Sequence, residues 1–353
     1  MNKLVNLPAV KSIKKILIIK WSAMGDIVIS TALFEDIRRA FPAASIDLNI
    51  LPPWDRLFKD DPRFAEIITV DLRKTEKGIK GVWRWLSEIR SRHYDLIVDL
   101  QSNDRSRWLM TALHLTGGRV PYRLGNHKRF PYNLAPEPPK KQSIHSFPVQ
   151  QRALASAGIP TLTPRPVLHV DEASRQRAKK LQEQFSLMPD HYAVFMPGCQ
   201  AAGYLKRWGA DNYAGLARLL HERGLKVAII GGPDEMDECE KIRATVGQEW
   251  LVNLCGKTQI VDIVPLAEQA RLIVGNDTGT AHVASASDRP MLVVCGPTDP
   301  NRVKPIGDNV QAIQVSGLDC INCYCKKPCD HHSCMKQITP QIALDKLIAM
   351  GAL

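Results

Sequence analysis

Apolar runs of strand length alternate with amphipathic helical patterns along the whole chain. The expected strands cover 14–20, 45–51, 67–72, 94–100, 191–198, 226–232, 271–277 and 291–297, and the expected helices cover 27–41, 81–92, 172–185, 212–224 and 260–270. Continuous apolar strands that alternate with helices are typical of parallel sheets covered on both faces. The repetition of this pattern predicts an α/β protein built from two Rossmann-like, doubly wound units.

A proline-rich stretch without helical periodicity, residues 158–170, separates the two series of strands. We therefore expect an N-terminal domain at 1–166 and a C-terminal domain at 167–353, and a chain of 353 residues has the length for two domains. If the two sheets face each other across a cleft, a ligand is expected beyond the carboxyl ends of their strands.

The composition, with 44% hydrophobic and 24% charged residues, is that of a folded globular protein. No apolar run has the length that a bilayer span needs. The first 22 residues carry lysines on both sides of their apolar part and no small-residue cleavage site. These features predict a cytoplasmic protein without a signal peptide or a transmembrane segment.

The net charge of +11 is concentrated in the first part of the chain. Residues 1–150 hold 25 Lys and Arg against 15 Asp and Glu, whereas the remaining residues hold 22 against 21. An anionic partner is therefore expected to meet the N-terminal half. Nucleic acid, phospholipid headgroups and a phosphorylated glycolipid all fit this description, and a basic face that only serves solubility explains the charge equally well.

The first candidate site is KWSAMGDIVIS, residues 20–30, where a strand ends, a small-residue turn with Gly25 follows and a helix begins. Such a junction points backbone N–H groups and a helix N-terminus towards an anion. It lacks the full glycine fingerprint of a dinucleotide site and the Gly-Lys-Ser/Thr of a phosphate loop. Asp26 has two interpretations: a capping residue of the helix, or a general base at the end of the first strand.

Two further turns follow strands in the second half. Lys206 in PGCQAAGYLKRWGADNY, residues 197–213, can neutralise a leaving diphosphate or can be an ordinary exposed cation. Glu235 in GGPDEMDE, residues 231–238, can accept hydrogen bonds from a ribose or a base, or can lie in a solvated first helical turn. The sequence leaves both alternatives open at this point.

The sequence GNDTGTAHVASASDRPMLVVCGPTDP, residues 275–300, contains the Asp-Thr-Gly of aspartic proteases at Asp277, Thr278 and Gly279. That chemistry needs two paired carboxylates, and here the motif occurs once within an α/β pattern, so a protease is excluded. What remains is a helix start with small residues that allow a ligand close approach and offer amides to a phosphate. His282, in the first turn, lies either on the ligand side or buried beneath the helix.

Five of the nine cysteines fall between residues 320 and 334. Cys320, Cys323, Cys329 and Cys334 have a spacing that four thiolate ligands of zinc or iron can adopt. In a cytoplasmic protein such a density of cysteines favours a metal over disulfides. A structural zinc or iron site in this Cys-rich loop, 320–334, and a surface loop of reduced cysteines are both compatible with the sequence.

Taken together, these stretches resemble glycosyltransferase family 9, the lipopolysaccharide heptosyltransferases. The resemblance runs almost from end to end, through KWSAMGDIVISTALFEDIRRAFP, DLIVDLQ, PG…KRW, GGPDE and GNDTGTAHVASASDRPMLVVCGPTDP, and the last of these is the most specific. It implies the GT-B fold, with an N-terminal acceptor domain and a C-terminal nucleotide-sugar domain. It also implies inverting transfer of L-glycero-D-manno-heptose from ADP-heptose to the Kdo or heptose of the lipopolysaccharide inner core, without a catalytic metal or other cofactor.

Carried over residue by residue, the resemblance makes Asp26 the general base that deprotonates the acceptor hydroxyl and Lys206 the cation on the donor diphosphate. The other donor-binding positions implied in this way are Gly25, Glu235, Thr258, Asp277, Thr278, Gly279 and His282. Inversion needs one carboxylate on the far side of the anomeric carbon from the leaving group, and the rest of the site stabilises charge. The stretch from Gly198 to Lys206 is two residues longer than the family pattern, so Gln200 is the nearest polar candidate for one phosphate contact.

The resemblance also implies a partner for the basic N-terminal half: an anionic acceptor of lipid A, Kdo and phosphates at the inner membrane surface. The candidate acceptor contacts are Arg105, Arg107, Arg123, Lys128 and Arg129, and nothing in the sequence selects among them. The protein is then expected to be cytoplasmic, peripheral to the inner membrane face and without a nucleic-acid partner.

Three rival functions remain. A family 9 transferase could use another nucleotide sugar or a protein acceptor. A metal-binding protein that contacts nucleic acid would use the basic half and the Cys-rich loop, but the sequence lacks interleaved aromatic and basic residues and this function leaves the strand–turn–helix motifs unexplained. A binding protein could hold a nucleotide without turnover.

Overall fold

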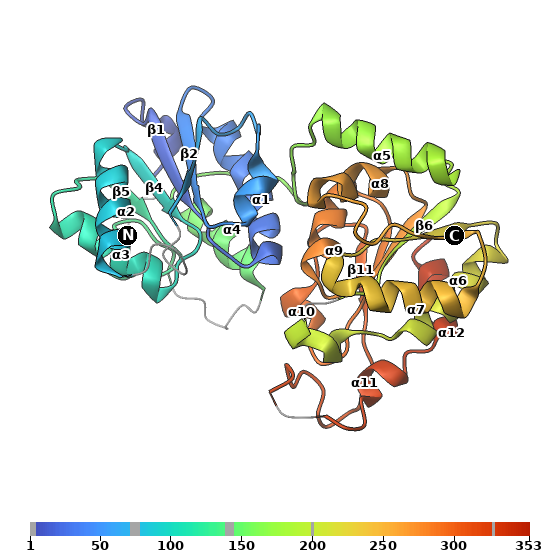
Figure 1. Ribbon diagram of the computed structural model, residues 1–353. Helices are drawn as coiled ribbons and strands as arrows, with labels where there is room; N and C mark the ends of the chain where they lie inside the picture. Colours follow the sequence, from blue (N-terminus) through green and yellow to red (C-terminus); the bar gives the residue numbers. More distant parts are fainter. Residues whose placement is uncertain (1–4, 71–77, 138–144, 199–200, 327–328) are drawn as a thin grey trace. The chain divides into compact units, whose positions relative to one another are not determined.

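The structure, a computed structural model, describes residues 5–70, 78–137, 145–198, 201–326 and 329–353 (Figure 1). The chain divides into two compact units, Met1–His169 and Val170–Leu353. The sequence pattern places this division at 166/167, and the binding roles expected for the two domains stay predictions.

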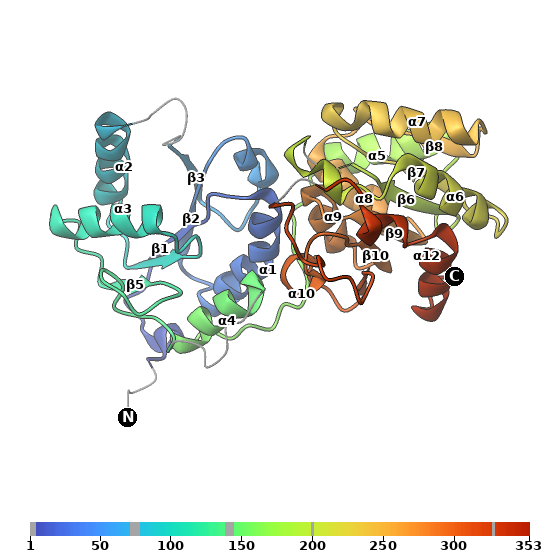
Figure 2. The same cartoon turned by 90° about the horizontal axis from the view of Figure 1, so that it is seen from below.

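Five parallel strands form the sheet of the first unit, in the order β3-β2-β1-β4-β5. The strands are β1 (Lys15–Ile19), β2 (Ser45–Ile50), β3 (Glu66–Thr69), β4 (Leu96–Asp99) and β5 (Tyr122–Leu124). The helices are α1 (Met24–Ala40), α2 (Ile79–Ser91), α3 (Asp104–Leu115) and α4 (Ser146–Ser156), with the 3-10 helices η1 (Leu7–Ala9) and η2 (Trp54–Phe58). Figure 2 shows α2 and α3 on one face of this sheet and α1 and α4 on the other.

The strand β1 lies at the centre of this sheet, between β2 and β4. The side chains of Ile16, Leu17, Ile18 and Ile19 are fully buried, because both faces of the strand are covered by helices. This explains the continuous apolar run of the sequence, which differs from the alternating pattern of a half-exposed strand. The carboxyl end of β1 leads directly to Lys20 and the turn before α1.

A buried asparagine fixes the aromatic core beside β1. The Oδ1 atom of Asn49 accepts hydrogen bonds from Nε1 of Trp21 at 2.8 Å and from Nε1 of Trp85 at 2.9 Å. Its Nδ2 atom donates to the carbonyl oxygen of Ile68 at 2.9 Å. Both buried indole N–H groups therefore have an acceptor, as burial requires. Since Trp21 directly precedes the turn into α1, this network also holds the beginning of the first candidate site.

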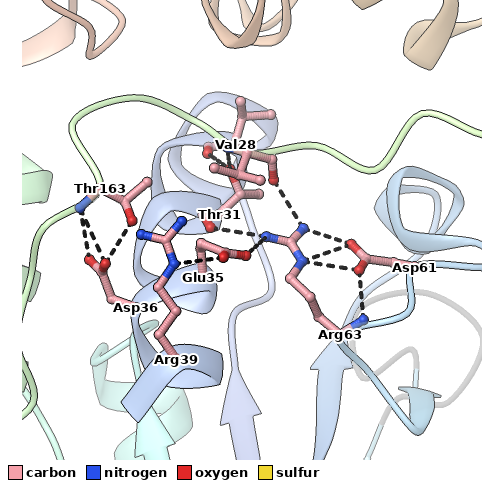
Figure 3. A network of polar contacts seen from close by, with 9 residues as sticks. Val28, Thr31, Glu35, Asp36, Arg39, Asp61, Arg63 and Thr163 are labelled. Carbon is pink, nitrogen blue, oxygen red and sulfur yellow. Dashed lines mark hydrogen bonds and ion pairs between the residues drawn. The ribbon is translucent and has the colours of Figure 1, made fainter. Parts of the chain in front are cut away.

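The proline-rich segment that follows α4 is bonded to α1 (Figure 3). The Asp36 carboxylate accepts hydrogen bonds from the backbone N–H of Thr163 at 3.2 Å and from its hydroxyl at 2.6 Å. Further along, the N–H of Val167 donates to the Thr31 hydroxyl at 2.9 Å, and Nη2 of Arg63 donates to the Val167 carbonyl at 2.9 Å. The segment therefore belongs with the first unit as far as Val167, and the division between the units lies beyond it.

Six parallel strands form the sheet of the second unit, in the order β11-β10-β9-β6-β7-β8. The strands are β6 (Tyr192–Met196), β7 (Lys226–Ile229), β8 (Leu251–Asn253), β9 (Leu272–Asn276), β10 (Met291–Val294) and β11 (Val310–Ile313). The helices are α5 (Glu172–Phe185), α6 (Ala210–His221), α7 (Met236–Val246), α8 (Ile263–Glu268), α9 (Gly279–Ala284), α10 (Pro300–Val303), α11 (Ser333–Lys336) and α12 (Pro340–Ala349). The 3-10 helices are η3 (Ala201–Lys206), η4 (Pro233–Glu235), η5 (Ile260–Asp262) and η6 (Ser285–Ser287).

The expected strands and helices are present, with ends shifted by up to three residues. Residues 71 and 72 of the strand expected at 67–72 lie outside the described residues, and α3, α4 and α7 are not among the expected helices. The helix expected at 27–41 begins at Met24, and the pattern at 260–270 forms a 3-10 turn followed by the short helix α8. The sequence pattern misses β5, β8 and β11, which have three or four residues each and lie at the edges of their sheets. Such short edge strands have too few buried positions to produce an apolar run.

Within the described residues, no helix combines the length and the apolar character that crossing a membrane requires.

Candidate active site

The carboxyl edge of the first sheet carries a group of charged residues. Lys20 follows β1 and lies beside Asp99, the last residue of β4, because Ile19 and Asp99 are partners in the β1–β4 register. The Lys20 side chain is buried, and its Nζ atom donates to the Leu100 carbonyl at 3.4 Å. Burial lowers the pKa of Lys20, and the neighbouring carboxylates of Asp26 and Asp99 oppose this effect. No sequence motif singles out Lys20, although its position at the end of an apolar strand is a usable signal.

Asp26 lies in the first turn of α1 and does not cap the helix. The capping position is Ala23, which forms no side-chain cap, so the capping interpretation of Asp26 is wrong. The reason is that the helix begins earlier than its apolar periodicity indicates, which moves Gly25 and Asp26 into the first turn. The half-buried Asp26 carboxylate accepts a hydrogen bond from the Ser146 hydroxyl at 3.2 Å. An acidic side chain at this end of a helix is favoured by the helix dipole.

The turn before α1 is held by Gln101, which follows β4. Its Oε1 atom accepts hydrogen bonds from the backbone N–H groups of Trp21 at 3.0 Å and Ser22 at 3.2 Å. The side chain of Gln101 thus connects the end of β4 to the turn that presents Asp26. The sequence DLIVDLQ contains this residue, but its role depends on the pairing of β1 with β4.

Asp99 is buried and bonded to the loop that follows β5. The Tyr132 hydroxyl donates to Oδ2 of Asp99, and the Ser102 N–H donates to Oδ1 at 2.8 Å. Burial raises the pKa of Asp99, and these hydrogen bonds oppose the shift. A Cβ atom on Gly125 would lie 2.7 Å from the Tyr132 ring, so glycine is required there. The loop that carries Lys128 and Arg129 is therefore anchored to the carboxyl edge of the sheet.

The five candidate acceptor contacts have different surroundings. Arg107 pairs with Asp104 at 3.0 Å, Lys128 pairs with Glu137 at 3.0 Å, and Arg105 and Arg129 are exposed. The Arg123 guanidinium donates to the backbone carbonyls of Pro131, at 2.7 Å, and Val120, and burial lowers its pKa. Through these contacts Arg123 stabilises the loop after β5. Its acceptor role, like those of Arg105, Arg107, Lys128 and Arg129, stays a prediction.

The carboxyl edge of the second sheet brings together residues from four neighbouring strand ends. Lys206 follows β6, Glu235 follows β7, Thr258 follows β8 and Asp277 follows β9, and the sheet order places these strands side by side. Gln200, which lies between β6 and Lys206, is outside the described residues. The sequence motifs identified these turns, and the parallel strand order explains why they meet at one edge.

Lys206 and Asp277 form an ion pair. The Nζ atom of Lys206 lies 2.8 Å from Oδ2 of Asp277, and the same carboxylate oxygen accepts a hydrogen bond from the Thr298 hydroxyl at 3.1 Å. Asp277 is buried, whereas the Lys206 side chain is 28% exposed. Lys206 is therefore not an ordinary exposed cation: its charge is fixed at the strand edge, next to the start of α9.

Asn276, which no sequence motif singles out, forms three hydrogen bonds at this edge of the sheet. It is the last residue of β9 and is fully buried. Its Oδ1 atom accepts hydrogen bonds from the N–H of Trp208 at 3.3 Å and the hydroxyl of Tyr213 at 3.1 Å, while its Nδ2 atom donates to the Pro197 carbonyl. Both ends of the loop that carries Lys206 are thus bonded to the end of β9.

The start of α9 is formed by the small residues that the sequence indicated. The Thr278 hydroxyl caps the helix by accepting from the N–H of Ala281 at 3.3 Å, and it lies 2.7 Å from the Thr280 hydroxyl. Gly279 is the first helical residue, and His282 is buried with 6% of its surface exposed. His282 is therefore largely shielded from solvent, and its contact with a ligand stays a prediction.

Glu235 is bonded within its own turn. Its Oε2 atom accepts a hydrogen bond from the N–H of Gly232 at 2.8 Å, and burial raises its pKa. A Cβ atom on Gly198 would lie 2.0 Å from the carboxyl carbon of Glu235, so the Pro-Gly turn after β6 packs directly on this side chain. Glu235 is half-buried, as is Thr258, although its neighbours Asp234, Met236 and Asp237 are exposed, so both interpretations of Glu235 stay open.

The Cys-rich loop gathers thiol groups near a cavity of about 440 Å³. Burial raises the pKa of Cys334 to about 11, and the nearby thiols of Cys323, Cys329 and Cys320 add to the shift. Within the part of the chain that the structure describes, no group of three or more His, Cys, Asp or Glu side chains is placed to hold a metal ion. The zinc or iron site predicted for these four cysteines stays a prediction.

The Cys-rich loop is hydrogen-bonded to segments that lie at the carboxyl edge of the second sheet. The Nε2 atom of His332 lies 2.6 Å from the carbonyl oxygen of Leu205 and donates to it, directly before Lys206. The N–H of Tyr324 donates to the Pro297 carbonyl at 2.8 Å, next to Thr298. No sequence pattern indicated these contacts, because they join residues far apart along the chain.

Comparison with known proteins adds a second line of evidence. Residues 82–333 match the family model of glycosyltransferase family 9 (heptosyltransferase). Lipooligosaccharide heptosyltransferase 2 of Haemophilus influenzae is 29% identical over 345 residues, which cover 94% of this chain and 98% of the relative. Lipopolysaccharide heptosyltransferase 2 of Escherichia coli is also 29% identical, with 95% of this chain and 98% of the relative covered.

Solved structures show the same architecture. The ADP-heptose lipopolysaccharide heptosyltransferase II of Escherichia coli matches with a TM-score of 0.71 and 26% identity, over 95% of this chain and 98% of that one. A glycosyltransferase of family 9 from Veillonella parvula matches with a TM-score of 0.78 and 21% identity, over 96% and 97% of the two chains. These likenesses confirm the predicted α/β, GT-B fold class.

Proposed function

This chain belongs to glycosyltransferase family 9, and from that premise we propose that it transfers L-glycero-D-manno-heptose from ADP-heptose to the Kdo or heptose of the lipopolysaccharide inner core. The observation that carries the proposal is the placement of Asp26. Its carboxylate is half-buried at the carboxyl edge of the first sheet, is not used as a helix cap and has the buried cation Lys20 as a neighbour.

In the proposed reaction Asp26 acts as the general base. It takes the proton of the acceptor hydroxyl while the acceptor oxygen forms a bond to the anomeric carbon of the heptose. The bond between that carbon and the diphosphate oxygen breaks on the opposite side, its electron pair leaves with ADP, and the configuration inverts. Lys20 is a buried basic neighbour of Asp26, and the Asp26 carboxylate opposes the lowering of the Lys20 pKa by burial. The reaction needs no metal or other cofactor in this proposal.

Lys206 is proposed to stabilise the leaving diphosphate. Its pairing with Asp277 at 2.8 Å holds the ammonium group at the strand edge before the donor arrives. A cation held in position costs less reorganisation during the reaction than one on a mobile side chain. The other donor-binding positions that we propose are Gly25, Glu235, Thr258, Thr278, Gly279 and His282.

The acceptor is proposed to be anionic lipid A with Kdo at the inner membrane surface. The excess of basic residues in 1–150 supports this partner, and Arg105, Lys128 and Arg129 are exposed cations among the candidate contacts. We also propose that the protein works in the cytoplasm, peripheral to the inner membrane face, where such an acceptor is presented.

A structural zinc or iron ion held by Cys320, Cys323, Cys329 and Cys334 is proposed for the Cys-rich loop, outside the reaction itself. Elemental analysis of the purified protein is expected to find close to one zinc or iron per chain, which is lost when Cys323 and Cys329 are replaced by serine. A well-folded protein without metal would instead identify these residues as reduced surface cysteines.

A donor screen tests the proposed function. The purified protein is offered ADP-heptose, other ADP-sugars, UDP-sugars and GDP-sugars, with a lipid-free Kdo–heptose acceptor and with a protein acceptor in parallel. Turnover that is restricted to ADP-heptose and the Kdo–heptose acceptor is the expected result. Preference for another nucleotide sugar, or transfer to protein, would favour the alternative family 9 activity, and binding without turnover would contradict the enzyme assignment.

A further inference from the structure

Large apolar side chains are exposed at the beginnings of α2 and α3 in the first unit. Ile79 is 74% exposed, Trp83 is 55% exposed and Trp108 is 71% exposed. Tryptophan is one of the costliest side chains to leave in water, and most tryptophans of folded proteins are largely buried. Two exposed tryptophans and an exposed isoleucine on two adjoining helices indicate a surface that contacts an apolar partner.

Basic residues accompany these apolar side chains at helical spacing. On α2, Ile79 and Trp83 are four residues apart and share a face, and Lys80 and Arg84 lie beside them with the same spacing. On α3, the exposed Arg105 lies three residues before Trp108. The opposite side of α2 is packed in the core through Trp85, Leu86 and Ile89. The exposed face therefore combines aromatic and basic groups, so the expectation that the sequence lacks such interleaving is wrong, while the buried face anchors the helix.

The topology places this face at the carboxyl edge of the first sheet, which carries Lys20, Asp26 and Asp99. All strands of the first sheet are parallel, α2 follows β3 and α3 follows β4, so both helices begin at the carboxyl edge of the sheet. The first two turns of these helices hold the exposed residues, and Lys20, Asp26 and Asp99 lie at the same edge. Figure 2 shows both helices on one face of the sheet.

We propose that the first unit binds an anionic lipid bilayer through a docking patch. This docking patch consists of Ile79, Lys80, Trp83, Arg84, Arg105 and Trp108. Indole rings favour the boundary between headgroups and acyl chains, and Lys and Arg bind anionic headgroups. The proposal rests on the proposed function in one respect: a lipid-anchored acceptor is presented at such a surface. The positive charge of the first 150 residues complements it. Aliphatic Ile79 suits acyl chains and offers nucleic acid no stacking surface.

Vesicle binding tests the docking patch directly. The full chain is mixed with vesicles of phosphatidylcholine alone or with about a third of phosphatidylglycerol, and bound protein is measured by flotation. Wild-type protein is expected to bind the anionic vesicles, less so at high salt. The double variant Trp83→Ser/Trp108→Ser is expected to bind at least tenfold more weakly, and Lys80→Glu to bind about fivefold or more weakly on anionic vesicles only.

A matched control separates the patch from general surface hydrophobicity. Leu115, at the opposite end of α3, is 72% exposed, and Met188 of the second unit is 64% exposed. The double variant Leu115→Ser/Met188→Ser is expected to bind vesicles like the wild type. The proposal is overturned if the tryptophan variant also binds like the wild type, if both double variants lose binding equally, or if the patch binds RNA or a second copy of the chain in place of vesicles.

A second readout distinguishes the docking proposal from the proposed function. Transfer to a lipid-free acceptor is expected to be unchanged in Trp83→Ser/Trp108→Ser, whereas transfer to the same acceptor embedded in anionic vesicles is expected to fall about tenfold. Thermal unfolding of each variant checks that the fold is intact. A wild-type protein that binds vesicles without transferring any sugar would refute the proposed function, and one that transfers sugar without binding vesicles would refute the docking patch.

Discussion

The Nζ atom of Lys206 lies 2.8 Å from Oδ2 of Asp277, so the cation proposed to act on the diphosphate is already paired with a carboxylate of the same unit. The Thr298 hydroxyl donates to the same oxygen, Oδ2, at 3.1 Å, so this oxygen is engaged by two groups of the protein. This arrangement fixes the position of the Lys206 ammonium group, through which Asp277 is proposed to act on the donor.

The pairing predicts that substitutions of the two residues are not additive. Lys206→Ala is expected to lower kcat by roughly two to three orders of magnitude, because the leaving group loses its positive charge. Asp277→Asn is expected to lower kcat about tenfold. The double variant is expected to have a kcat/KM for ADP-heptose no lower than that of Lys206→Ala. A double-mutant cycle on kcat/KM measures this. Additive losses would show that the two side chains act independently.

The burial of Lys20 predicts a specific pH dependence of stability. Its pKa is lowered in the folded protein from the ordinary 10.5, so the unfolded chain binds more protons at this site. The free energy of unfolding therefore increases as the pH rises from the lowered pKa of Lys20 in the folded protein to its ordinary pKa of 10.5. Lys20→Met is expected to remove this contribution and to lower kcat about tenfold, because Asp26 loses a nearby cation.

Urea unfolding between pH 7 and pH 10, together with steady-state kinetics, checks both effects. Lys14→Met is the matched control, since Lys14 is an exposed lysine directly before the same strand. The control is expected to leave the pH dependence and kcat unchanged. If Lys20→Met and Lys14→Met behave alike, the buried ammonium has no part in the site.

The hydrogen bond from His332 to the Leu205 carbonyl predicts a positioning role for the Cys-rich loop. His332→Ala is expected to raise KM for ADP-heptose about two- to tenfold with a smaller change in kcat, because the turn before Lys206 loses one hydrogen bond. His332→Gln, which retains a donor, is expected to restore most of the affinity.

The neighbouring His331 provides the control for this prediction, because it is exposed and bonds Ser333 within its own loop. His331→Ala is expected to leave KM unchanged. Equal effects of both alanine variants, or no rescue by glutamine, would mean that His332 only maintains the fold of the loop.

The turns of the candidate site could be predicted from the sequence because each directly follows a buried strand. Asp277 directly follows β9, Lys206 and Glu235 lie in the turns that follow β6 and β7, and parallel strands bring these turns to one edge. The same reasoning predicted the α/β class. Local patterns of this kind suffice when position along a strand decides where a side chain lies.

Contacts between distant segments could not be predicted in the same way. Lys206 and Asp277 are 71 residues apart, and His332 and Leu205 are 127 residues apart. The burial of Lys20 results from the pairing of β1 with β4 and from the covering helices, which a single strand pattern does not describe. The start of α1 was misplaced for a related reason: its first turn contains few buried apolar residues, so the periodicity begins after the helix does.

The central claim is that Asp26 is the general base, and Asp26→Asn tests it most directly. The substitution keeps the size of the side chain and an acceptor for the Ser146 hydroxyl while removing the basic group. In this variant kcat is expected to fall by roughly 10²–10⁴-fold or more, with the Kd for ADP-heptose unchanged in equilibrium binding. Wild-type turnover retained by the Asp26→Asn variant would contradict it.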